Sequence, residues 1–182
     1  MKEQLKNRNL LNPTGFKFII NTLPQVDFYC QEAPVPGVNT AVPNAPNIFV
    51  DLDVPPNKMT FDDLNITFLV DEDLVNYASI LNWIKGMCKP ESFRQSREFL
   101  NSGPMQKAGE LYLNEYSNAN LYILTNNYTY NIRVEFDHIF PTRLSGLQFK
   151  STETDINYIT ADATFRYTNY RLYDKDGNRM TV

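Results

Sequence analysis

Two stretches near the C-terminus alternate between apolar and polar residues, and this period of two limits the fold more than any other feature. In the first, 128–137, the apolar residues stand at even positions; in the second, 159–168, they stand at odd positions. Strands with one dry face and one wet face are typical of antiparallel sheets in a sandwich or barrel. The sequence therefore predicts a mainly β fold of two packed antiparallel sheets, a sandwich or partly open barrel.

Shorter strand patterns precede and separate these two stretches. We expect strands at 15–20, 25–32, 61–70, 119–126, 127–140 and 142–153. Aromatic residues make up 13% of the chain, which favours pleated, half-buried surfaces. With 182 residues, we expect one β-domain over 13–182, preceded by an N-terminal arm or short helix at 1–12. Within 88–118, "PESFRQSREFLNSG" is consistent with one or two helical turns, and "KAGELYLNEY" with a strand or a helix.

One amphipathic helix is predicted directly after the strand at 61–70. Leu74, Ala78 and Leu81 are spaced as on one helix face, with Tyr77, Ile80 and Ile84 beside them, and Gly86 suits a left-handed residue after the last turn. The prediction is a helix at 73–85, laid on a sheet.

The acids between that strand and the helix allow two interpretations. Asp71 or Asp73 can accept hydrogen bonds from the free amides of a first helical turn, where the helix dipole also favours negative charge. A catalytic carboxylate pair would need a cleft and a partner with a raised pKa, and the sequence offers none. We interpret both residues as helix caps.

The segment 33–57 carries most of the prolines of the chain. Proline removes ladder donors, so this segment is not a central strand; we expect an extended excursion with an edge strand at 48–52. It is also too apolar for a bare solvent loop, which predicts an intermolecular arm. Its apolar residues are Val35, Val38, Val42, Ile48, Phe49, Val50, Leu52 and Val54.

No pattern in the chain proposes a reaction. His138 is the single histidine, Cys30 and Cys88 lack metal-ligand spacing and are expected reduced and buried, and "YDKDGNR" at 173–179 is a turn more simply than a calcium loop. No nucleotide-binding or zinc-protease motif is present. We expect no catalytic residues, no cofactor and no metal.

Net charge and hydropathy limit the classes of molecule that this chain is expected to bind. The net charge is −4 without a basic block, which argues against wrapping DNA phosphates. No run of 18 apolar residues and no signal peptide are found, so we expect synthesis in the cytoplasm and no membrane partner.

Four stretches carry a resemblance to a known family. They are "FYCQEAPVPGV" at 28–38, "MTFDDLNITFLVDEDLVNYASILNWI" at 59–84, "YTYNIRVEFDHIFPTRLSGLQF" at 128–149 and "ITADATFRYTNYRL" at 159–172. In this order they resemble the tail tube proteins of contractile-tailed bacteriophages and the baseplate and tail-end proteins of the same fold.

The resemblance implies a virion protein of the phage tail. Six copies would form a homohexameric ring, and stacked rings would make a channel through which DNA passes, with tail sheath, baseplate and tape-measure proteins as partners. A tube initiator next to the baseplate and a head-proximal adaptor are alternatives within the family. In such a ring we expect the polar side of the closing strand to face the channel or the next ring; it comprises Thr160, Asp162, Thr164, Arg166 and Thr168.

The second hypothesis for the function belongs to another class of protein: a monomeric β-sandwich that binds sugar or peptide through its tyrosines. An enzyme is the third hypothesis.

Overall fold

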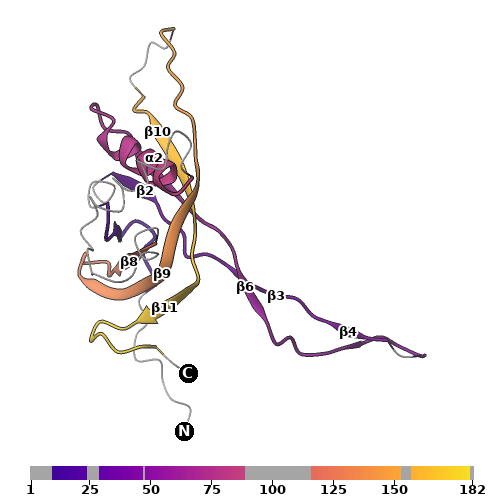
Figure 1. Cartoon of the computed structure of the whole chain (residues 1–182). Coiled ribbons are helices and arrows are strands. Elements are labelled where there is room, and N and C mark those ends of the chain that lie inside the picture. The colour runs from indigo at the N-terminus through magenta and orange to yellow at the C-terminus, as the bar shows by residue number, and fades with distance from the viewer. Residues whose placement is uncertain (1–9, 24–28, 47, 89–115, 153–156, 181–182) are drawn as a thin grey trace, which may run out of the picture.

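The computed structural model describes residues 10–23, 29–46, 48–88, 116–152 and 157–180. Antiparallel strands make up most of the regular secondary structure, and the described part holds one helix (Figure 1). The predicted mainly β fold with one flanking helix is confirmed. The predicted structure of 1–9, of 24–28 and of most of 88–118 falls outside the described residues.

The body of the molecule is a seven-stranded sheet that bends into a nearly closed barrel. Its strand order is β1-β8-β9-β10-β7-β2, with β11 also paired to β9. The strands are β1 Phe16–Ile20, β2 Cys30–Glu32, β7 Leu64–Leu69, β8 Ser117–Leu124, β9 Tyr130–Leu144, β10 Thr160–Arg166 and β11 Asn169–Tyr173. The pairings between these described strands are all antiparallel, as the alternating faces predict.

Strand β9 joins the two halves of the barrel. Its first part pairs with β8 on one edge and β11 on the other, and its last part pairs with β10. Two separate strands are predicted at 127–140 and 142–153, but β9 continues through Pro141 to Leu144, and residues 145–152 do not form a strand. Pro141 lies at a register shift, where β10 pairs irregularly with β9 and a missing amide donor is tolerated.

A β-bulge at His138 reverses the alternation inside β9. Ser117 pairs with Ile139 and Ala119 with Phe136, so two residues of β9 lie opposite Asn118. His138 has a φ of 53°, and its amide donates to Asn118 Oδ1 at 3.2 Å. The inserted residue lets Phe136 and Ile139 both point into the core.

Helix α2 (Val75–Cys88) covers the core; it begins and ends later in the chain than the predicted helix at 73–85. Its buried residues are Asn76, Ile80, Trp83 and Gly86. The predicted stripe is confirmed in part: Ile80 is buried, and Tyr77 and Ile84 pack against the core. Its predicted start is wrong, because Leu74 precedes the helix with a φ of 56° and is exposed. Gly86 is buried within the last turn and is not the left-handed residue after it.

The core lies between the barrel wall and α2. On β7 and β10 the predicted inward faces are confirmed, since Leu64, Ile66, Phe68, Ala161, Ala163 and Phe165 are fully buried. Phe18, Leu121, Val134, Phe136 and Trp83 complete the same cluster.

Candidate functional site

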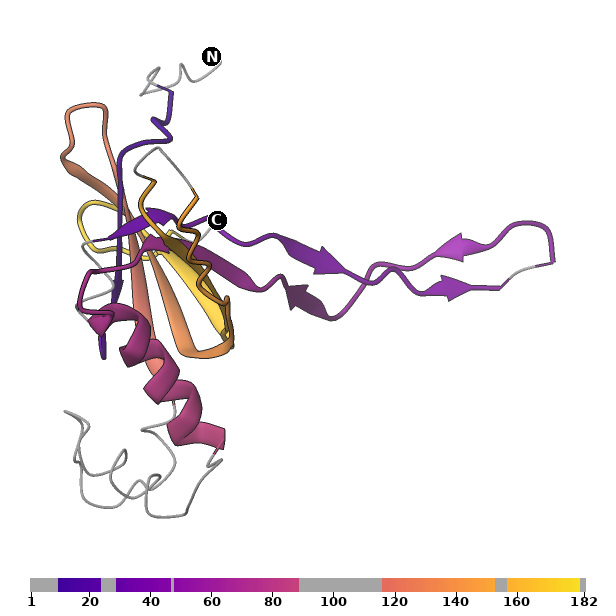
Figure 2. The same ribbon diagram turned by 90° about the horizontal axis from the view of Figure 1, so that it is seen from above.

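The most prominent feature outside the body is a long two-stranded ribbon between β2 and β7, which we call the arm (Gly37–Asp62). β3 (Val38–Thr40) pairs with β6 (Met59–Phe61), and β4 (Asn44–Ala45) pairs with β5 (Leu52–Asp53). Figures 1 and 2 show the arm projecting far from the barrel. Most of the segment 33–57 lies in this ribbon, but residues 48–50 form the bend at its tip and are not part of the edge strand expected at 48–52.

Apolar side chains of the arm point into solvent. At the tip, Ile48 is 93%, Phe49 89% and Val50 68% exposed. Val38, Val42, Val54 and Met59 along the ribbon are also exposed, as is Val35 just before it. Leu52 lies in β5, opposite Ala45. Several exposed apolar side chains on one projecting segment are characteristic of a site that contacts another molecule.

Hydrogen bonds tie the base of the arm to the end of β10. The Tyr167 hydroxyl donates to the Asp62 carbonyl at 3.0 Å, and Arg166 Nε donates to Asp63 Oδ1 at 3.0 Å. Inside the arm, Asn39 Nδ2 donates to Asp62 Oδ1 at 2.6 Å. The two contacts with Tyr167 and Arg166 join residues more than 100 positions apart, so no sequence pattern could reveal them.

Burial, together with the nearby charges of Tyr170, Asp62 and Asp63, raises the pKa of Tyr167 to about 12. The hydroxyl therefore stays protonated, and able to donate, well above the ordinary tyrosine range.

The polar face of β10 is a network of short polar side chains. The Thr67 hydroxyl donates to Asp162 Oδ1 at 2.7 Å, and the Thr164 hydroxyl donates to Asn65 Oδ1 at 2.8 Å. With Thr160 and Arg166 on the same strand, these side chains lie on the side of the sheet opposite the core. The structure brings four of the five predicted face residues, Thr160, Asp162, Thr164 and Arg166, onto one surface; Thr168 lies beyond the end of β10.

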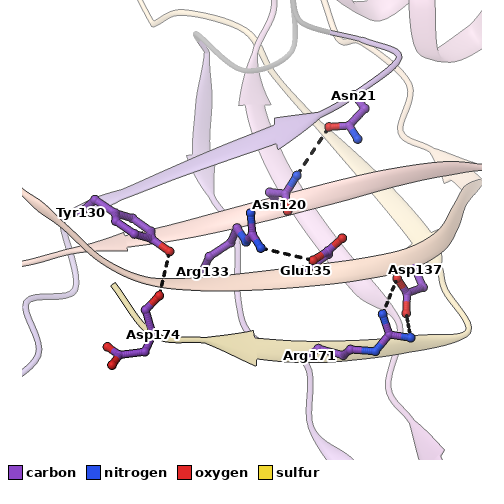
Figure 3. Close-up of polar contacts among 8 residues, drawn as sticks. All are labelled: Asn21, Asn120, Tyr130, Arg133, Glu135, Asp137, Arg171 and Asp174. Carbon is purple, nitrogen blue, oxygen red and sulfur yellow. Dashed lines mark hydrogen bonds and ion pairs between the residues drawn. The ribbon is translucent and has the colours of Figure 1, made fainter. Parts of the chain in front are cut away.

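A second polar face covers the outside of β8, β9 and β11 (Figure 3). Arg171 donates to both carboxylate oxygens of Asp137, at 3.3 and 2.9 Å, and the Tyr130 hydroxyl donates to the Asp174 carbonyl at 3.2 Å. The Arg133 guanidinium lies 4.6 Å from the centre of the Tyr173 ring. These contacts link neighbouring strands, which is a structural role for the side chains.

The acid cluster before α2 does not cap the helix as predicted. Asp71 Oδ1 accepts from the Asp73 amide at 2.8 Å, within a turn that ends before Val75. The buried Asn76 holds the helix start instead: its Nδ2 donates to the Leu69 carbonyl at 2.8 Å, and its Oδ1 accepts from the Asp71 amide at 3.4 Å. The sequence signal for this helix start is therefore the asparagine in its first turn, which the capping interpretation did not use.

The remaining predicted chemical groups lie apart from one another. His138 is exposed on the bulge of β9, and its ring meets Tyr116 edge-on at 5.9 Å. Cys30 and Cys88 carry free thiols; Cys88 is exposed and Cys30 half-buried, so the expectation that both are buried is wrong. The sequence "DKDGN" forms the predicted turn, in which the Gly177 amide donates to the Asp174 carbonyl at 2.9 Å.

Within the described ranges, no three His, Cys, Asp or Glu side chains gather as a metal site would need. The helix described here is not long and apolar enough to cross a membrane.

This chain matches one protein family and shares its fold with solved structures. Residues 5–173 match the family described as phage tail tube protein. The tail tube terminator protein of Enterobacteria phage T4 is 27% identical over 176 residues, covering 93% of this chain and 92% of that protein. The tube terminating cap of the anti-feeding prophage has the same fold, with a TM-score of 0.62, 11% identity and coverage of 94% of this chain and 96% of that one.

A terminator chain of the PVC contractile injection system also shares the fold, with a TM-score of 0.56, 10% identity and coverage of 91% and 97%. The resemblance seen in the four sequence stretches is thereby confirmed. The family match spans nearly the whole chain, and this protein belongs to the phage tail tube protein family.

Proposed function

We propose that this chain is a tail tube terminator, a structural protein without catalytic activity that closes the inner tube of a contractile tail at its head-proximal end. Six copies would form one ring around the channel through which DNA passes. The full-length similarity to the T4 tail tube terminator protein favours the terminator over the tube subunit or the baseplate initiator.

The single observation that carries the assembly is the exposed apolar tip of the arm. Ile48 and Phe49 are 93% and 89% exposed, and the ribbon holds them away from the core of their own chain. A head-to-tail contact, in which the arm of each copy rests on the next, is heterologous and closes a ring when six such steps complete a rotation. The same arm reaching outward would alternatively contact the next ring.

The sheet edges support the same assembly. β1 and β2 end the strand order, so each offers one unpaired edge in the described structure. Unpaired edges are usually covered or paired in native proteins, and pairing between neighbours would remove both at once.

Tail sheath and tape-measure proteins would be further partners, because a ring at the end of the tube adjoins both the outer layer and the channel. DNA would be passing cargo only. The net charge of −4 per copy fits a channel wall that does not retain phosphates.

Electron microscopy of the purified chain, alone and mixed with tail tubes of the same phage, tests this function. A terminator should form single six-fold rings and should bind only one end of each tube, because one face of its ring does not accept another copy. Self-polymerisation into long tubes would instead make it the tube subunit. A strict monomer that never binds tubes would favour the β-sandwich binding module.

Deleting residues 39–52 should leave a folded monomer that forms no rings. Normal rings from this variant would show that the arm is not the connecting element. Light scattering after size-exclusion chromatography gives the mass of both species.

A further inference from the structure

Two residues of the body contact two consecutive acids where the arm joins β7. Tyr167, in the break between β10 and β11, donates its hydroxyl proton to the Asp62 carbonyl at 3.0 Å. Next to it, Arg166 pairs with Asp63 at 3.0 Å. Both contacts hold the returning side of the arm, the side that continues into β7.

Asp62 also holds the outgoing side of the arm. Its amide donates to the Gly37 carbonyl at 3.0 Å, and its Oδ1 accepts from Asn39 Nδ2 at 2.6 Å. A side chain on Gly37 would place a Cβ only 2.5 Å from Asp62 Oδ2, so the missing side chain is what lets the carboxylate reach Asn39. One residue thus connects both strands of the arm to the body.

Aromatic rings continue this connection into the core. The Phe61 ring lies 5.7 Å from that of Tyr167 and 5.5 Å from that of Tyr170. Tyr167 in turn lies 5.2 Å from Phe136, which is fully buried. The base of the arm is therefore packed against the core of the barrel, whereas the side chains at its tip are exposed to solvent.

We propose that Tyr167, together with Asp62 and Asn39, is a positioning group that sets the direction of the arm before any neighbouring copy is present. An isolated two-stranded ribbon is at best marginally stable, and ordering it during assembly would cost conformational entropy. Fixing the ribbon in advance removes that cost from the binding step. The proposal rests on the proposed function, in which the arm joins one copy to the next.

The direct test measures the spread of arm orientations in dilute, unassembled protein. In a Cys30→Ser, Cys88→Ser background, spin labels are placed at Val50→Cys on the tip and Asn126→Cys in the exposed β8–β9 turn. Double electron–electron resonance should give a narrow distance distribution for this parent. Tyr167→Phe, Asn39→Ala and Gly37→Ala should each broaden it.

Assembly is the second readout. Loss of one hydrogen bond at the base should raise the protein concentration needed for ring formation by up to about tenfold. Tyr170→Phe is the matched control, because the ring of Tyr170 contacts Phe61 whereas its hydroxyl does not hydrogen-bond to the described part of the arm; it should change neither readout. Asn39 is exposed, so Asn39→Ala keeps the test decisive if Tyr167→Phe folds poorly.

A broad distribution in the parent, or one that stays narrow in Tyr167→Phe and Asn39→Ala, would overturn the proposal. A variant with a broadened distance distribution but unchanged ring formation would also overturn it. If the parent assembles normally without residues 39–52, the proposed role of the arm fails, while the distance distributions still decide whether the arm is preset.

Discussion

The indole of Trp83 on α2 lies against the ring of Phe165 on β10, with 6.2 Å between the ring centroids and an angle of 50° between the planes. This contact attaches the single described helix to the closing strand. Both side chains are buried, at 3% and 0% exposure, so the barrel and the helix share one core.

Truncating this contact should destabilise the whole protein. Trp83→Ala removes a buried aromatic and leaves a cavity, for an expected loss of about 3–5 kcal/mol in the free energy of unfolding. Asn82→Ala, on the exposed side of the same turn, should change it by less than about 0.5 kcal/mol. Urea denaturation of both variants checks this; equal effects would mean that the helix is not part of the core.

The two faces of β10 should respond oppositely to a new charge. Phe165→Asp places an unpaired carboxylate in the core and should prevent folding. Thr164→Asp points to the polar face, opposite Arg143 on β9, and should leave a cooperative thermal transition. Its effect should be confined to ring formation or DNA passage. Greater loss of folding in Thr164→Asp would show that the faces are reversed.

Polar substitution at the tip of the arm should separate folding from assembly. Ile48→Ser, Phe49→Ser and Val50→Ser, made together, remove side chains that are largely in solvent, so the melting temperature should not fall. Ring formation should be lost. Tyr128→Ser, an exposed aromatic outside the arm, is the control and should still assemble. Rings of unchanged stability in the triple variant would contradict the interface.

The start of α2 should depend on Asn76 more than on the acids before it. Asn76→Ala removes the side-chain donor to the Leu69 carbonyl in a buried site, for an expected loss of about 1–3 kcal/mol in the free energy of unfolding. Asp73→Ala removes an exposed carboxylate that is not a cap, for a change within about 0.5 kcal/mol. A larger loss in Asp73→Ala would restore the capping interpretation. Guanidinium denaturation distinguishes the two.

Ionisation of Tyr167 should weaken the protein at high pH. Its folded pKa of about 12 lies above the ordinary value of 10.0, so the stability that it contributes is complete below pH 10 and is lost as the pH rises towards 12. The melting temperature should therefore fall more steeply over this interval in the wild type than in Tyr167→Phe. Tyr170→Phe removes one of the lesser causes of the raised pKa but leaves the burial of Tyr167, so it should keep most of the wild-type slope. Parallel pH profiles for all three proteins would show that Tyr167 is not held neutral by the fold.

Much of the fold could be predicted because it depends on local periodicity. The alternation in 159–168 identified the inward and outward sides of β10, and the prolines of 33–57 excluded a central strand. Both inferences use only neighbouring residues, since side-chain direction in a strand repeats every two residues and proline always removes a donor. The family resemblance likewise rested on short stretches in a fixed order.

The tertiary structure decided what depends on residues distant in sequence. The bulge at His138 exists because two residues of β9 meet Asn118 of β8, and it changes which side chains are buried beyond it. The helix turns Asn76 inward and leaves Asp71 outside because the Leu69 carbonyl needs a donor there. The base of the arm combines Asn39, Asp62 and Tyr167, whose contact requires β3, β6 and β10 to be in place. Periodicity determines which side of an element is apolar, but only packing determines which distant partner each polar group meets.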